Sequence, residues 1–149
     1  YPSDWGEVDA VIIPGGAAGA NDGTDWMQRL CVEVKGLAEE GRVRVFGLCL
    51  GHQVVAKALG GEVIKNSKGL QAGSIDVLLT NDGQRALNTA AIQIPMLFHH
   101  NDVVSRLPPG ALSLGVSEGC GVQGMVVGSN VLTMQAHPEF STEAGKQSL

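Results

Sequence analysis

The first 60 residues alternate between continuous apolar runs and a helical period. Segments 8–14 and 43–48 are short, apolar and rich in β-branched residues, which predicts two buried strands. Helices are predicted over about 25–40 and 50–59. The first ends at Gly41, a residue suited to closing a helix, and its apolar positions at helical spacing are Trp26, Met27, Leu30, Val34 and Leu37. This alternation predicts a flavodoxin-like, three-layer, mostly parallel α/β sheet with helices on both faces.

The second half predicts short strands separated by turns. The strand candidates are 74–80, 96–99, 111–116, 123–127 and 130–135. Turns are predicted at Asn81-Asp82-Gly83, at Pro108-Pro109-Gly110 and at Gly128-Ser129-Asn130, and the last of these predicts a hairpin. The C-terminal half therefore adds antiparallel strands, and the tail from Ser141 to Leu149 could begin a helix. No repeat or linker divides the chain.

Length and composition narrow the function. A chain of 149 residues corresponds to one domain, 1–149, that is able to bury its own core. A net charge of −5 and 4% aromatic residues argue against nucleic acid as a partner. No stretch reaches 18 apolar residues, so no membrane span is predicted. Three cysteines without a C-x-x-C pair favour a reduced, cytoplasmic setting.

A candidate nucleophile stands at the junction of the second strand and the second helix. In Gly47-Leu48-Cys49-Leu50-Gly51, glycines on both sides allow a very tight turn, as in the G-x-S-x-G elbow of hydrolases. The helix N-terminus should favour the thiolate and lower the thiol pKa. The same turn points the amide of Leu50 toward any oxyanion formed there. A small buried cysteine with no chemical role is the alternative.

His137 is the preferred base among the four histidines. It follows the apolar strand 130–135 in the stretch Ala136-His137-Pro138-Glu139, where Glu139 can fold back to orient the imidazole. His52 lies one helical turn beyond Cys49 but should point along its own helix face. The alternative for the last three residues of this stretch is an ordinary turn with a solvated glutamate.

A metal site built from cysteine and histidine is disfavoured. The candidates Cys49, His52, His99 and His100 match no standard zinc spacing. We therefore predict no metal and no cofactor. For the polar group His99, His100 and Asp102, no catalytic role is assigned.

Four segments in order resemble class I glutamine amidotransferases, in the branch of the GMP synthetase glutaminase domain and the γ-glutamyl peptidases. These segments are Pro14-Gly15-Gly16, the stretch from Gly47 to Gln53, the stretch from Ala58 to Val63 and the stretch from His100 to Val104 followed by Leu107-Pro108; His137-Pro138-Glu139 completes the pattern. The resemblance covers nearly the whole chain. It implies a cysteine hydrolase that releases ammonia from glutamine for an amidotransfer reaction.

The resemblance also implies roles for individual residues. Cys49 would be the nucleophile, His137 the base and Glu139 its orienting partner. The oxyanion would be held by the amides of Leu50 and Gly16. Substrate would be bound by Gly15, Gln53, His100 and Asn101.

Two expectations follow from where the pattern departs from the family. The family begins with a further strand and helix and ends with a full helix, so the chain, which opens at Tyr1, is expected to be truncated at both ends. No segment here would accept ammonia, so a synthase domain or subunit is an expected partner. A stand-alone γ-glutamyl peptide hydrolase with the same triad, and a catalytically silent binding or regulatory module, remain as alternatives.

Overall fold

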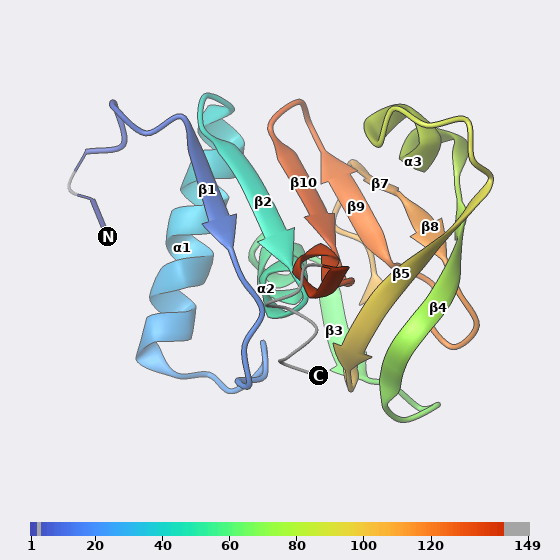
Figure 1. Ribbon diagram of the computed structural model, residues 1–149. Helices are drawn as coiled ribbons and strands as arrows, with labels where there is room; N and C mark the ends of the chain where they lie inside the picture. Colours follow the sequence, from blue (N-terminus) through green and yellow to red (C-terminus); the bar gives the residue numbers. More distant parts are fainter. Residues whose placement is uncertain (3, 142–149) are drawn as a thin grey trace.

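The computed structural model describes residues 1–2 and 4–141 of the chain. Three helices, ten strands and a terminal 3-10 turn alternate along this part (Figure 1). In order they are β1 (Ala10–Ile13), α1 (Asp25–Glu40), β2 (Arg44–Leu48), α2 (Leu50–Ala58), β3 (Glu62–Lys65), β4 (Gln71–Leu79), α3 (Asn81–Ala86), β5 (Gln93–His100), β6 (Asp102–Arg106), β7 (Ala111–Ser113), β8 (Gly115–Val116), β9 (Gly124–Val127), β10 (Val131–Met134) and η1 (Pro138–Ser141).

The central sheet is mixed rather than mostly parallel, which corrects the sequence-based prediction. Its five strands lie in the order β1-β2-β10-β9-β7. The pairs β1–β2 and β2–β10 are parallel, whereas β10–β9 and β7–β9 are antiparallel. The reason is that β10 follows β9 through a tight hairpin at Gly128-Ser129-Asn130 and still inserts beside β2. Two smaller antiparallel sheets, β3–β6 and β5–β4–β8, complete the fold.

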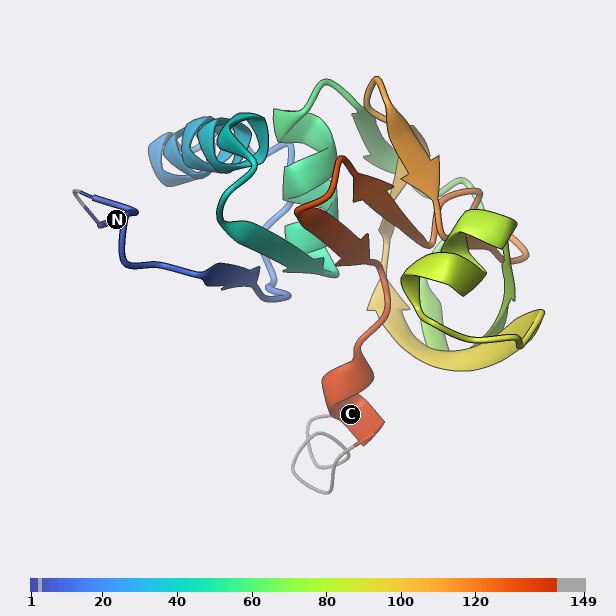
Figure 2. The ribbon, with the colours of Figure 1, turned by 90° about the horizontal axis from the view of Figure 1, so that it is seen from above.

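Both long helices cover the same face of the central sheet, so helices on both faces were a wrong expectation for the described residues. Viewed from above, α1 and α2 lie on one side, while the short α3 lies at an edge on the other (Figure 2). The main core fills the space under α1 and α2, and Met27, Val34, Val45, Val54 and Met125 are among its fully buried members. The first turn of α2 therefore rests directly on the sheet.

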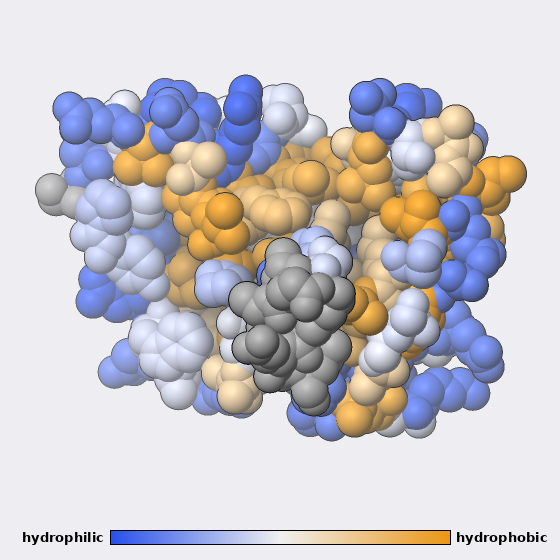
Figure 3. All heavy atoms as spheres, in the orientation of Figure 1, coloured by the Kyte–Doolittle hydropathy of each residue, from blue (hydrophilic) through white to orange (hydrophobic). Residues whose placement is uncertain are grey.

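The opposite face of the sheet presents a row of apolar side chains that we call the cross-strand row. Its members are neighbours in register on five successive strands: Ile12, Phe46, Leu132, Val126 and Leu112. Ile12 is 65% exposed and Leu112 is 48% exposed. Hydrophobic atoms are visible on this face over β1, β2 and β10 (Figure 3). In the described part of the chain, no helix lies over the centre of this row.

Most of the predicted elements are present, with four differences. The predicted turn at Asn81-Asp82-Gly83 is the start of α3, because the Thr80 side chain accepts a hydrogen bond from the Gly83 amide and caps a helix. The predicted strand 111–116 divides into β7 and β8, which belong to different sheets. Strands β3 and β6 were not predicted. The possible C-terminal helix over 141–149 lies almost wholly outside the described residues. None of the described helices is both long and apolar enough to cross a membrane.

Candidate active site

Cys49 occupies a sharp turn between β2 and α2. Its backbone has φ 48° and ψ −105°, a region that residues other than glycine rarely adopt. The flanking glycines make the turn possible: a Cβ on Gly51 would lie 2.1 Å from the Ile13 carbonyl oxygen, and one on Gly47 would lie 2.7 Å from the Gly51 carbonyl oxygen. The Cys49 amide donates to the Met134 carbonyl at 3.0 Å, which ties the turn to β10. The elbow predicted from the sequence is therefore confirmed.

His137 follows β10 and is held on three sides. Its Nδ1 lies 2.7 Å from Oε1 of Glu139. Its ring stacks on Phe140 with centroids 4.3 Å apart and planes 9° from parallel. Its backbone amide donates to the Leu97 carbonyl of β5 at 2.8 Å. The carboxylate fixes Nδ1 as the protonated nitrogen, which leaves Nε2 able to accept a proton.

Gly15 brings the two halves of this arrangement together. A Cβ added to Gly15 would lie 2.8 Å from Cε1 of His137 and 3.4 Å from Cβ of Cys49. The imidazole and the cysteine side chain therefore converge on one point, although 88 positions separate them in the chain. Only a residue without a side chain leaves room for both. The three residues that the resemblance assigned to a triad, Cys49, His137 and Glu139, thus lie together.

The thiol does not have the lowered pKa expected from its place at a helix N-terminus. Burial raises the pKa of Cys49, and the negative charge of Glu139 raises it further; the Leu50 amide and the Gln135 side chain act in the opposite direction. Cys49 is only 7% exposed, so loss of hydration outweighs the helix dipole. Its Sγ lies 3.9 Å from the His99 carbonyl oxygen, the geometry of a weak S–H donor. The resting nucleophile is thus the neutral thiol, and a base has to remove its proton.

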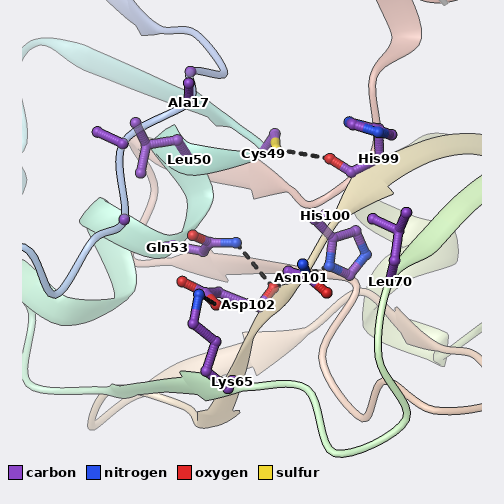
Figure 4. Close-up of a pocket in the computed structure, with 13 residues that line it drawn as sticks. Ala17, Cys49, Leu50, Gln53, Lys65, Leu70, His99, His100, Asn101 and Asp102 are labelled. Atoms are coloured by element: carbon purple, nitrogen blue, oxygen red, sulfur yellow. Dashed lines mark hydrogen bonds and ion pairs between the residues drawn. The ribbon is translucent and has the colours of Figure 1, made fainter.

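A pocket of about 270 Å³ opens beside the thiol (Figure 4). Five of the residues that the resemblance assigned to the oxyanion hole or to substrate line it together with Cys49: Gly16, Leu50, Gln53, His100 and Asn101. Gly16 lies against Leu50, since a Cβ on Gly16 would be 3.1 Å from Cδ2 of Leu50. Gly15 lies behind Cys49 and His137. The pocket is of the size that a small amino acid such as glutamine needs.

Gln53 links the nucleophile to the far end of this pocket. Its backbone amide donates to the Cys49 carbonyl at 3.2 Å, and its side-chain Nε2 donates to the Asp102 carbonyl at 3.0 Å. The Asp102 carboxylate in turn pairs with Nζ of Lys65 at 2.7 Å. Lys65, on β3, and Leu70 line the pocket but were not predicted, because only the pairing of β3 with β6 brings Lys65 there.

The remaining histidines are neutral and belong to the frame of the site. His52 is fully buried, its Nδ1 lies 2.7 Å from Oγ1 of Thr133, and burial lowers its pKa to about 3. Burial also lowers the pKa of His100, whose Nδ1 donates to the Asp102 carbonyl at 2.9 Å. No group of three or more histidine, cysteine or acidic side chains able to hold a metal occurs within residues 1–2 and 4–141.

Comparison with known proteins identifies the family. The family model for class I glutamine amidotransferases matches residues 3–149. A glutamine amidotransferase-like protein of Schizosaccharomyces pombe is 38% identical over 146 residues, which cover 96% of this chain and 58% of that protein. Gamma-glutamyl peptidase 3 of Arabidopsis thaliana is 28% identical over 146 residues, 95% of this chain and 58% of the peptidase.

One part of a synthase and one solved structure complete the comparison. A component of the glutamine-hydrolysing GMP synthase of Sulfolobus acidocaldarius, one of its subunits, is 38% identical over 141 residues, 93% of this chain and 72% of that component. The crystal structure of a glutamine amidotransferase from Methylobacillus flagellatus superimposes with a TM-score of 0.84 and 29% identity, over 92% of this chain and 54% of that one. The chain thus spans little more than half of several relatives, and it belongs to the class I glutamine amidotransferase family.

Proposed function

We propose that the chain carries a cysteine hydrolase site that cleaves the γ-amide of glutamine and releases ammonia. Cys49 is the nucleophile, His137 the base and Glu139 the carboxylate that orients it. The observation that supports this most directly is the convergence of Cys49 and His137 on Gly15, with Glu139 2.7 Å from the far ring nitrogen. A nucleophile, a base and an orienting group in contact are the elements of a catalytic triad.

The raised pKa of the thiol determines the order of the steps. His137 takes the thiol proton on Nε2 as the sulfur attacks the side-chain carbonyl carbon of glutamine, and the oxyanion is held by the amides of Leu50 and Gly16. When the C–N bond breaks, the same proton passes to the leaving nitrogen as ammonia. Water, deprotonated by His137, then hydrolyses the γ-glutamyl thioester, which gives glutamate and restores the thiol.

Gln53, His100, Asn101 and Gly15 are the proposed substrate contacts. Both amide hydrogens of Gln53 are used within the protein, on the Asp102 carbonyl and on Oε1 of Gln135. Its carbonyl oxygen is therefore the atom that accepts a hydrogen bond from substrate. The side chain of His100 is occupied by the Asp102 carbonyl, so His100 and Asn101 contribute through their backbone.

Two acceptors of the γ-glutamyl chemistry are compatible with this site. The similarity to part of a GMP synthase favours ammonia passed on to a synthase domain or subunit. The similarity to γ-glutamyl peptidase 3 favours cleavage of γ-glutamyl peptides with the same triad, the leaving group being a peptide amine. We place glutamine hydrolysis first because the family model and two relatives named for glutamine chemistry match nearly the whole chain.

The test compares ammonia release from glutamine with cleavage of γ-glutamylcysteinylglycine by the same preparation. Glutamine should be the better substrate, and Cys49→Ala should abolish both activities while the far-ultraviolet circular dichroism stays unchanged. Faster cleavage of the peptide would establish the peptidase alternative. Hydrolysis retained by Cys49→Ala would overturn the assignment of the nucleophile.

A catalytically silent module is separated by labelling. The glutamine analogue 6-diazo-5-oxo-norleucine should modify Cys49 in a 1:1 ratio, and free glutamine should protect against it. A folded chain that neither hydrolyses glutamine nor takes up the label would be a binding or regulatory module.

A further inference from the structure

Gln135 is a buried amide that the triad does not use. It follows β10 directly, two residues before His137, and it is completely buried. Its backbone amide donates to the Gln123 carbonyl at 2.9 Å, which fixes the main chain at this point. Its side chain extends from there toward Gln53 and Cys49. A buried amide of this kind is costly unless its donors and its acceptor are both used.

The orientation of the Gln135 amide is fixed by a chain of hydrogen bonds. The Asp102 carbonyl can only accept, so the NH₂ group of Gln53 faces it, at 3.0 Å. The same NH₂ group lies 3.1 Å from the Gln135 side chain, which must therefore present its oxygen there. Nε2 of Gln135 is left on the other side, where the side chain donates to the Cys49 thiol. Apart from the sulfur, Nε2 has no partner among residues 1–2 and 4–141.

The surroundings of the sulfur explain why such a donor is needed. Cys49 is buried, and Glu139 is the nearest charge that acts on it, with the wrong sign for a thiolate. Only two groups favour the ionised sulfur, the Leu50 amide and the Gln135 side chain. The Leu50 amide is also the proposed oxyanion donor, so it leaves the sulfur when the oxyanion forms. A hydrogen bond to a charged atom is about twice as strong as one between neutral groups.

We propose that Gln135 is a positioning residue that holds the Cys49 sulfur by donating an N–H to it as it ionises, and that Gln53 and the Asp102 carbonyl keep the Gln135 amide in the donating orientation. The inference rests on the proposed role of Cys49 as the nucleophile. It adds a fourth side chain to the machinery of the site. It also makes the wall of the substrate pocket part of the support of the nucleophile.

The decisive variant is Gln135→Met, which keeps the length of the side chain and removes the donor. Its matched control is Gln123→Met: Gln123 is also a buried amide, but its side chain binds Ser117 and Gln71 and not the thiol. The rate of alkylation of Cys49 by iodoacetamide is measured between pH 6 and pH 11, with the Cys49 peptide followed by mass spectrometry. This readout does not require turnover of glutamine.

Gln135→Met should move the midpoint of the alkylation profile to higher pH and slow alkylation at pH 7.5 by about tenfold to a hundredfold, the size expected when an ion loses one hydrogen bond. Gln123→Met should leave the profile unchanged. Gln135→Glu, which places a negative charge beside the sulfur, should shift the midpoint further than Gln135→Met. Thermal unfolding of each variant shows whether it is folded.

Three results would overturn the inference. These are an unchanged profile in Gln135→Met, an equal shift in Gln123→Met, and a smaller shift in Gln135→Glu than in Gln135→Met. Failure of the proposed function gives a different pattern, since a parent chain that does not hydrolyse glutamine can still show the dependence of Cys49 alkylation on Gln135. A parent chain that hydrolyses glutamine with no such dependence refutes the inference alone.

Discussion

At the scale of single residues, the site combines a strained backbone at Cys49 with tight packing around His137. A non-glycine residue with positive φ costs about 1–3 kcal/mol and persists only where its surroundings enforce it. Here the enforcement comes from the Cys49 amide bonded to Met134 on one side and from the glycine contacts on the other. The strain places the thiol at the edge of the sheet, beside an imidazole that Glu139 and Phe140 hold still.

Removing the base should cost more than removing the group that orients it. His137→Ala should lower kcat for glutamine hydrolysis by about 10⁶-fold, and Glu139→Gln by roughly 10²–10⁴-fold, because orientation is secondary to proton transfer. Steady-state ammonia release measures both. Glu40→Gln, an exposed change at the end of α1, is the control and should have no effect. A larger loss for Glu139→Gln than for His137→Ala would reverse the assigned roles.

Gly15→Ala should inactivate the site without unfolding the chain. The new methyl group would lie 2.8 Å from Cε1 of His137 and would push the ring away from the thiol. A displacement of about 1 Å can cost roughly 10²-fold in rate. The comparison variant is Gly121→Ala, where an added Cβ meets no atom within 4 Å. Ammonia release normal in Gly15→Ala would show that the contact is not rigid.

Sequence reasoning located residues of the site that belong to one local pattern and missed those that meet only through tertiary packing. Cys49 and His137 stand in short motifs whose chemistry is visible in the letters. Lys65 and Gln135 carry no such signal, because the first reaches the pocket through the pairing of β3 with β6 and the second through its amide orientation. The thiol pKa was predicted in the wrong direction because burial cannot be seen in a local motif.

At the scale of elements, the junction of β2 with α2 depends on contact between backbones. The first turn of α2 packs so closely on the end of β1 that Gly51 has no space for a side chain. Local signals predicted α1 and α2 well, since helical periodicity and the closing residue Gly41 are both local. The same signals failed for the sheet, because the sequence does not show that β10 inserts beside β2.

Two glycine substitutions in helices should have opposite effects on stability. Gly51→Ala should reduce the free energy of unfolding by about 1–3 kcal/mol, because its Cβ would overlap the Ile13 carbonyl. Gly36→Ala, in the middle of α1 where no atom lies within 4 Å of the added Cβ, should increase it by about 0.5–1 kcal/mol. Urea unfolding followed by circular dichroism measures both. A stabilised Gly51→Ala variant would mean that α2 is not held on β1 as described.

At the scale of the whole molecule, the two faces of the central sheet differ in what covers them. One face packs against α1 and α2 around a closed core. The other carries the cross-strand row, with Ile12 and Leu112 open to solvent. An apolar surface that crosses five strands is larger than the isolated hydrophobic residues of an ordinary surface.

The cross-strand row should bind hydrophobic dyes in the 149-residue chain. Replacing Ile12 and Leu132 together by lysine should sharply reduce the fluorescence of bound anilinonaphthalene sulfonate, because two charges interrupt the row. Val32→Lys removes an equally exposed apolar residue from α1, away from this face, and should leave the fluorescence unchanged. Equal losses in both proteins would show that the dye binds elsewhere.

The parallel pairing of β2 with β10 has a consequence for how such enzymes diversify. These two neighbouring strands deliver the thiol and the imidazole, whereas the segments between them in the chain, from β3 to β6, build the opposite wall with Lys65, Leu70 and Asp102. Mutation can therefore remodel the wall, insert into its loops or change its charge while the reacting atoms keep their separation. One reaction can in this way be inherited intact by descendants that differ in what they cleave and in which molecule receives the product.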